Sequence, residues 1–113
     1  MPRFDGLILN VFYILWEYTV RSGKHRQFQR HYSSEGTWAK FFRRDPHYVE
    51  TILLRNQRSR LRYVTIDVWK SATSYRKFKR RFKAEYEAID QRFETLTLKE
   101  HFLGYFEIPD LGM

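Results

Sequence analysis

Aromatic side chains are the groups in this sequence best suited to hold a ligand. The 113 residues include ten Phe, eight Tyr and three Trp, which together make 19% of the chain. Large flat rings can stack on a flat small molecule, and they can equally fill a protein core. Trp16, Trp38, Tyr63, Trp69 and Tyr75 are spread along the chain, so a fold can bring them together. The composition leaves both roles open, a site for a flat aromatic molecule and a packed core.

Side chains that usually perform catalysis are few. The chain has no Cys, which excludes disulfides, thiolate metal sites and cysteine nucleophiles. Its four His residues show no metal-ligand spacing, so we expect no metal site. No glycine-rich phosphate loop and no Gly-x-Ser-x-Gly motif occur. Asp67 or a His that the fold brings near a pocket is the candidate for a general base.

A basic run covers residues 76–83, where six of eight side chains are Lys or Arg. Phe78 and Phe82 are four residues apart within it, so a helix would turn both rings toward the core and the cations toward water. We favour this solvated face. The alternative is a surface that binds an anion such as nucleic acid, acidic lipid or a small carboxylate, and the net charge of +8 is compatible with either.

These side chains must be positioned by four strands and three helices. The β-branched and aromatic segments 11–20, 47–56, 60–70 and 98–108 predict strands. Helical spacing of apolar residues predicts helices at 24–33, 36–44 and 72–94, and the last contains the longest apolar stripe. The apolar run from Leu7 to Trp16 is too short for a membrane helix, so we assign it to the first strand.

The order of these elements predicts an α+β fold. Gln57-Arg58-Ser59 is a short connection, so the two strands that it joins should be antiparallel neighbours. With two helical crossovers, the result is a ferredoxin-like βαββαβ sandwich that has a four-stranded antiparallel sheet and helices on one face. The length of 113 residues fits a single domain, 1–113, with its core at about 11–108.

The first and last predicted strands are apolar on both faces, which a sheet covered on one face does not need. Phe12, Ile14 and Trp16 alternate with Val11, Tyr13 and Leu15, and Phe102 and Phe106 alternate with Leu103 and Tyr105. We therefore expect the second face to be covered, most simply by a second copy in a homodimer. We also expect a soluble cytoplasmic protein without membrane segments, because no signal-peptide pattern is evident.

Two segments of the sequence resemble the antibiotic biosynthesis monooxygenase (ABM) domains, and the resemblance spans about residues 12–108. The first segment is Gly36-Thr37-Trp38-Ala39-Lys40-Phe41-Phe42-Arg43-Arg44, which runs into Pro46 and the second strand. The second is Tyr63-Val64-Thr65-Ile66-Asp67-Val68-Trp69-Lys70-Ser71, followed by Tyr75, Phe78 and the pair Glu85-Tyr86.

The resemblance implies a dimeric α+β barrel, in which two ferredoxin-like sheets pack face to face. Some members of the family oxidise aromatic polyketides with molecular oxygen and need no metal or flavin. Others oxidise quinols, degrade haem or have no known activity. The shared pocket lies between sheet and helices, with the strand-end Trp, here Trp69, in its wall. The substrate-binding candidates are Trp16, Trp38, Tyr63, Trp69, Phe78 and Phe82.

This sequence departs from the haem-degrading branch at two positions. Lys79 stands where that branch has a haem-ligating His, and Trp16 stands near the position of its Asn. We therefore expect no cofactor, and our leading hypothesis is a cofactor-independent monooxygenase for a phenolic, anthrone or quinol-like substrate. Under this hypothesis the catalytic candidates are Asp67, or a His near the pocket, as the base and Trp69 as the ring on which the substrate stacks.

Two other functions are compatible with the same fold. One is a non-catalytic ligand-binding or dimerisation domain. The other is an RNA-binding module, because RNA-recognition domains share this strand order. The segment Arg62-Tyr63-Val64-Thr65-Ile66 matches only the later half of their third-strand motif. We therefore do not favour nucleic acid as a partner.

Overall fold

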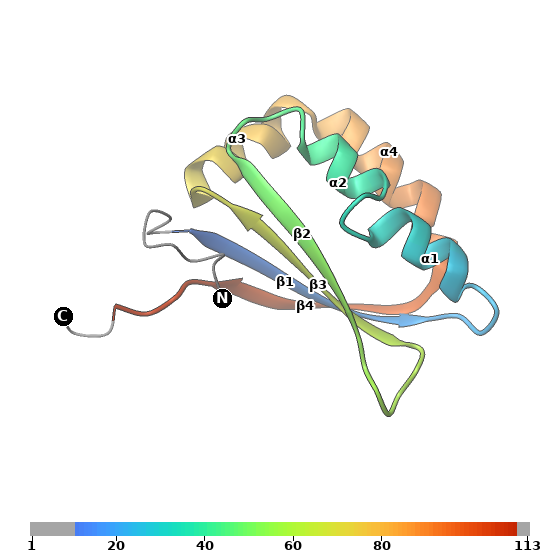
Figure 1. Cartoon of the computed structure of the whole chain (residues 1–113). Coiled ribbons are helices and arrows are strands. Elements are labelled where there is room, and N and C mark those ends of the chain that lie inside the picture. The colour runs from blue at the N-terminus through green and yellow to red at the C-terminus, as the bar shows by residue number, and fades with distance from the viewer. Residues whose placement is uncertain (1–10, 111–113) are drawn as a thin grey trace.

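A four-stranded sheet carries a single layer of helices in this computed structural model, which describes residues 11–110 (Figure 1). Residues 7–10 of the apolar run assigned to the first strand lie outside the described residues. The elements in chain order are β1 (Phe12–Val20), α1 (His25–Tyr32), α2 (Thr37–Phe42), β2 (Tyr48–Arg55), β3 (Arg62–Trp69), α3 (Ala72–Arg81), α4 (Lys83–Phe93), the 3₁₀ turn η2 (Glu94–Leu96) and β4 (Thr97–Phe106).

The strands lie in the order β2-β3-β1-β4, and every neighbouring pair is antiparallel. The first strand is therefore central, between the third and the last. All the helices cover the same face of the sheet (Figure 1). This arrangement confirms the predicted ferredoxin-like sandwich.

The prediction of one continuous helix over 72–94 is wrong in detail. Phe82 leaves the helical conformation (φ −111°, ψ 32°) and separates α3 from α4. Its ring packs against Phe41 and Phe78, while its backbone still takes part in helical hydrogen bonds on both sides. Such a kink lets a long helical segment follow the core beneath it. No helix within residues 11–110 is both long and apolar enough to cross a membrane.

The predicted alternation along the last strand is also wrong. Gly104 has a φ of +134°, and the register with β1 shifts beside it. Because this irregularity adds a residue to the strand, Phe102 and Tyr105 both pair with inward-facing positions of β1, Trp16 and Ile14. Phe106 is turned to the opposite face.

Trp69 lies at the centre of the aromatic core between the layers. Its side chain is fully buried, and its ring centroid lies 5.2–5.7 Å from those of four neighbouring rings. These neighbours are Phe42, Tyr48, Tyr75 and Phe78. Rings from the helices and the sheet are thus held together around one side chain.

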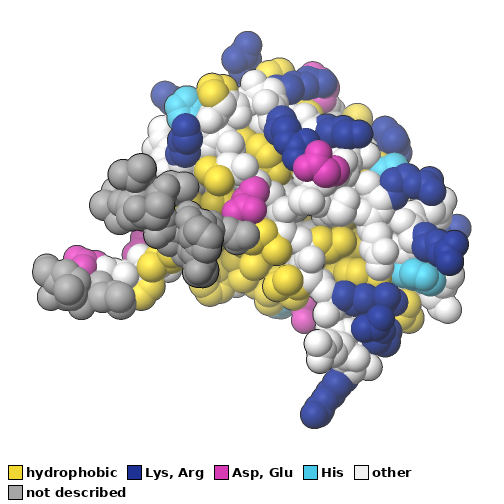
Figure 2. All heavy atoms as spheres, in the orientation of Figure 1, with side chains coloured by type: hydrophobic (Ala, Val, Ile, Leu, Met, Phe, Trp, Pro, Cys, Tyr) yellow, Lys and Arg dark blue, Asp and Glu magenta, His cyan; other side chains and the backbone are white. Residues whose placement is uncertain are grey.

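The face of the sheet that the helices leave uncovered is largely aliphatic. Leu15, Val64 and Ile66 occupy its centre, and Leu54 and Phe106 are about half exposed. Figure 2 shows hydrophobic side chains gathered along the sheet below a helical layer that is rich in Lys and Arg. The basic run 76–83 lies mostly in that solvated layer, since all its cations except Lys79 are exposed.

We predict that Trp69→Ala destabilises the protein strongly. Removing a fully buried Trp leaves a cavity and should lower the free energy of unfolding by about 3–5 kcal/mol. Trp16→Ala is the matched comparison, because Trp16 is only half-buried and should cost less than about half as much. Urea unfolding followed by circular dichroism measures both, and equal losses would contradict the central role of Trp69.

Candidate functional site

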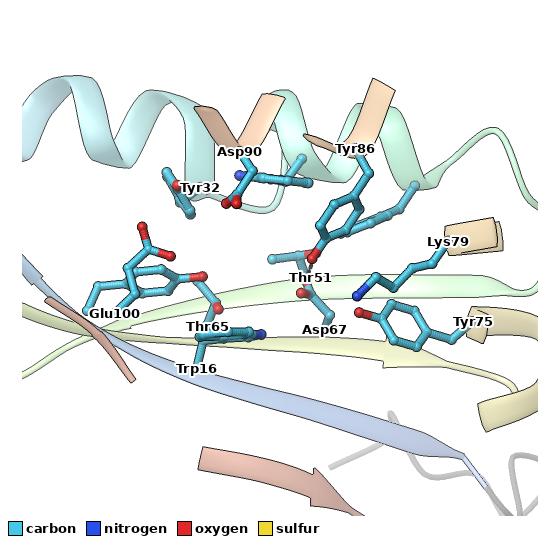
Figure 3. A pocket seen from close by; sticks show the side chains of 13 residues that line it. Trp16, Tyr32, Thr51, Thr65, Asp67, Tyr75, Lys79, Tyr86, Asp90 and Glu100 are labelled. Atoms are coloured by element: carbon cyan, nitrogen blue, oxygen red, sulfur yellow. Dashed lines mark hydrogen bonds between the residues drawn. The ribbon is translucent and has the colours of Figure 1, made fainter. Parts of the chain in front are cut away.

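A cavity of about 250 Å³ lies between the sheet and the helical layer (Figure 3). Strands β1, β2, β3 and β4 supply its floor and one end, and α1, α2, α3 and α4 supply its roof. The described side chains that line it supply aromatic rings, hydroxyl groups, carboxylates and one ammonium group. A partly enclosed space of this kind is the usual form of a small-molecule site.

The floor follows from strand alternation and register. Thr51 of β2 lies directly opposite Asp67 of β3, and Trp16 of β1 lies opposite Thr65 of β3. Side chains two residues apart on a strand share a face, so Thr65 and Asp67 both point toward the helices. The pairing of three strands thus brings these four side chains together under the helical roof.

The carboxylate of Asp67 is the most perturbed acid in the floor. Thr51 Oγ1 donates a hydrogen bond of 2.6 Å to Asp67 Oδ1. Burial disfavours the ionised form and raises the pKa of Asp67 to about 6, although the hydrogen bond from Thr51 acts in the opposite direction. A carboxyl group that ionises near neutral pH can both accept and return a proton.

Tyr48 extends this contact into a chain of hydroxyl groups. Tyr48 Oη lies 2.7 Å from Thr51 Oγ1. When Asp67 is ionised, the Thr51 proton points to the carboxylate, so Tyr48 must be the donor to Thr51. The carboxylate is therefore held in place by a chain that starts in the core beside Trp69.

Two tyrosines and Lys79 form the wall at one end of the cavity (Figure 3). Lys79 Nζ lies 5.5 Å from the ring centroid of Tyr75 and 4.6 Å from that of Tyr86. Burial raises the pKa of Tyr75 well above its usual range, and burial raises that of Tyr86 to about 12. Both hydroxyls therefore stay protonated at neutral pH and can donate hydrogen bonds.

Two carboxylates stand at the other end. Asp90 from α4 and Glu100 from β4 both point into the space, as Figure 3 shows. Burial raises both pKa values. Repulsion from Glu94 raises the pKa of Asp90 further. Repulsion from Asp90 and Glu94 likewise raises the pKa of Glu100. Thr97 Oγ1 donates to Glu100 Oε2 at 3.1 Å.

Two buried polar atoms in the lining have no hydrogen-bond partner of good geometry among the described residues. They are Thr65 Oγ1 and Trp38 Nε1, whose residues are 3% and 8% exposed. Burial raises the pKa values of Tyr18 and Tyr32, and their hydroxyls lie near enough to Thr65 and Trp38 for these two polar groups to oppose that rise. Buried polar groups are rarely left unpaired, so these atoms are available to a ligand in the cavity.

The structure divides the residues predicted for the site into two sets. Trp16, Trp38 and Asp67 line the cavity. The other four form the core around it: Tyr63, Trp69, Phe78 and Phe82. Trp69, which the sequence places in the wall, is fully buried behind Phe42 and Tyr75, two residues that do line the cavity.

Several lining residues were not singled out from the sequence. Lys79, Tyr86 and Asp90 are among them, and they follow Tyr75, which the sequence does single out, at helical spacings of 4, 7 and 4 residues, a signal that could have marked them as one face. Thr51, by contrast, carries no local signal, since only the register with β3 brings it to Asp67. Within residues 11–110, no group of three or more His, Asp or Glu is placed to hold a metal ion.

Comparisons with known proteins find this fold in solved structures. No family model matches the sequence, and no curated protein matches it significantly. SnoaB, a cofactor-independent oxygenase from Streptomyces nogalater, superimposes with a TM-score of 0.61 at 23% identity, over 89% of this chain and 95% of that chain. A single-residue variant of SnoaB gives 0.64 at 21% identity, over 92% and 99%.

A candidate antibiotic biosynthesis monooxygenase from Bordetella bronchiseptica superimposes with a TM-score of 0.69 at 12% identity, over 88% of this chain and 98% of that chain. The structural neighbours are thus ABM-type proteins, as the resemblance in the sequence predicts. At these identities the likeness establishes the fold.

We predict that Thr51→Val raises the pKa of Asp67 above about 6, because the hydrogen bond from Thr51 stabilises the ionised carboxylate. Carbon-detected NMR titration of the carboxyl group measures the change. Thr65→Val is the matched control, since Thr65 lines the same cavity but its hydroxyl makes no hydrogen bond of good geometry within residues 11–110, so the pKa of Asp67 should stay in place. An unchanged or lowered pKa in Thr51→Val would contradict the assigned contact.

Proposed function

We propose that this protein is a cofactor-independent monooxygenase of the ABM type, acting on a phenolic, anthrone or quinol-like aromatic substrate. The observation that carries the proposal is the Asp67 carboxylate, which has a pKa of about 6 and lies in a cavity with aromatic walls. The fold shared with SnoaB, described as a cofactor-independent oxygenase, supports the same reaction class.

The cavity suits a flat ring with oxygen substituents. Trp16 and Trp38 offer ring faces from opposite layers, β1 and α2. The hydroxyls of Thr65, Tyr75 and Tyr86 can hydrogen-bond to the oxygen atoms of such a ring. Aromatic stacking and a few convergent polar groups are what a small aromatic ligand requires.

Asp67 is the proposed general base. It removes a proton from the substrate, and the carbanion that results is delocalised onto a ring oxygen. Lys79 and the protonated hydroxyls of Tyr75 and Tyr86 stabilise that charge from one end of the cavity. The chain from Tyr48 through Thr51 holds Asp67 in place for the transfer.

Molecular oxygen is the oxidant in the remaining steps. The substrate anion transfers one electron to O₂, and the radical pair combines at carbon to give a peroxide that takes the proton back from Asp67. Loss of water then leaves a carbonyl. The net change converts one CH₂ group and O₂ into C=O and H₂O, so atoms and electrons balance without a further reductant.

The uncovered face of the sheet argues against an RNA platform. RNA-recognition domains stack bases on aromatic side chains of that face, whereas its centre here is made by Leu15, Val64 and Ile66. Its aromatic rings Tyr13 and Phe106 are paired with each other near one end of β1. We propose instead that a second copy covers this face, giving a homodimer through the sheets. Its aliphatic character and the half-exposed Leu54 and Phe106 support this assembly.

We predict oxygen uptake by the purified protein with a panel of anthrones and hydroquinones, followed with an oxygen electrode. Asp67→Asn removes the base and should lower kcat/KM by about 10²–10⁴-fold. Because the base must be ionised, kcat/KM should rise with pH through the pKa of about 6 and then level off. Glu35→Gln is the control, since Glu35 is exposed between α1 and α2 and lines neither the cavity nor the uncovered face of the sheet. Full activity in Asp67→Asn would rule out the proposed base, and no uptake with any panel member would favour a binding domain without catalysis.

We predict a solution mass of twice the 14.0 kDa of one chain. Leu54→Lys together with Val64→Lys places two charges on the uncovered face and should yield monomers in sedimentation velocity. Gln27→Lys, on the exposed side of α1, adds charge elsewhere and should leave the dimer intact. A wild-type monomer, or a double variant that stays dimeric, would contradict assembly through this face.

A further inference from the structure

The charge inside the cavity is opposite to the charge of the whole chain. The protein carries a net charge of +8, and its exposed helical layer is rich in Lys and Arg. The described side chains that line the cavity include the three carboxylates of Asp67, Asp90 and Glu100, against the single ammonium of Lys79. A basic protein that gathers acids in this cavity disfavours anions at that place.

Asp90 and Glu100 form an acidic pair at the end away from Lys79 (Figure 3). They come from different elements, α4 and β4, and no ion pair within residues 11–110 neutralises either of them. Lys79 does lower the pKa of Asp90, but burial and the repulsion from Glu94 outweigh it. A bound cation would remove this repulsion, whereas an anion would increase it.

Lys79 is already engaged by the rings around it. Its ammonium lies 4.6 Å from the centroid of Tyr86 and 5.5 Å from that of Tyr75, at distances typical of cation–π contacts. It therefore serves the end of the cavity where the proposed function needs a positive charge. Among the described side chains that line the cavity, Lys79 is the only cation, and it acts on Asp90 without forming an ion pair with it.

Aromatic faces and unpartnered polar atoms complete the acidic end. Tyr32 lies beside the two carboxylates in Figure 3, Trp16 lines the floor below, and aromatic faces attract ammonium groups. Thr65 Oγ1 lies in the same region, is almost fully buried and has no partner of good geometry among the described residues. Its lone pairs can accept a hydrogen bond from an N–H group.

We propose that Asp90 and Glu100 bind a protonated amine, so that the substrate is a phenolic or quinol-like ring that carries a cationic arm. The ring lies toward Asp67 and Lys79, and the ammonium lies between the two carboxylates. The part of this proposal that concerns the ring rests on the proposed function. The charge preference of the cavity does not, and binding measurements test it without turnover.

Three phenols of nearly the same shape separate the charge states. Tyramine is a cation at neutral pH, 4-ethylphenol is neutral and 4-hydroxyphenylacetate is an anion. Isothermal titration calorimetry on the purified full-length protein gives their dissociation constants. We expect tyramine to bind about tenfold more tightly than 4-ethylphenol, and 4-hydroxyphenylacetate to bind least tightly.

The double variant Asp90→Asn with Glu100→Gln assigns the preference to its residues. Tyramine and 4-ethylphenol should then bind within about twofold of each other, with 4-ethylphenol little changed from wild type. Glu35→Gln removes one exposed carboxylate outside the cavity and should keep the wild-type preference. Circular dichroism confirms that each variant is folded.

Three results would overturn the proposal. The first is that 4-hydroxyphenylacetate binds most tightly, which would mean that Lys79 decides the charge of the ligand. The second is that tyramine shows no measurable binding. The third is that the double variant still prefers tyramine over 4-ethylphenol. A protein that prefers tyramine but takes up no oxygen with any panel substrate would retain this amine site and lose the proposed reaction. The two proposals thus fail on different measurements.

Discussion

The packing of Trp69 between the sheet and the helices is the contact on which the rest of the site depends. Its buried indole touches rings from α2, β2 and α3, and so joins three elements that also contribute to the cavity wall. Tyr48 contacts this indole with its ring and the Thr51 hydroxyl with its own oxygen. The same side chain that closes the core therefore orients the polar chain that ends at Asp67.

Two electrostatic environments share one small space as a result. At one end Lys79 is held between tyrosine rings, where it can stabilise developing negative charge. At the other end Asp90 and Glu100 repel each other and leave a place for positive charge. Asp67 lies in the floor beneath, where burial and not a neighbouring charge sets its proton affinity. A ligand with a protonated amine at one end and an ionisable ring at the other matches these two ends in only one orientation.

Much of the fold and part of the site follow from local sequence patterns. The four strands, the helical layer and their order agree with alternation and helical spacing, because both periodicities are properties of neighbouring residues. The same patterns missed the kink at Phe82 and the irregularity beside Gly104. Both depend on how a ring or a strand meets the packed layer, which is not a local property. Among the predicted site residues, Trp16, Trp38 and Asp67 line the cavity, whereas the larger set of rings fills the core.

The sequence by itself determined the order of the elements and the number of aromatic side chains. It also determined the position of one acid, Asp67, two residues before the strand-end Trp69. Only the tertiary structure decided which aromatics became wall and which became core, since a ring buries equally well in either place until its neighbours are known. The partner of Asp67 was decided in the same way, because cross-strand register brings Thr51 to it from sixteen residues away. So was the acidic pair, since Asp90 and Glu100 belong to a helix and a strand that meet only when the sheet is covered.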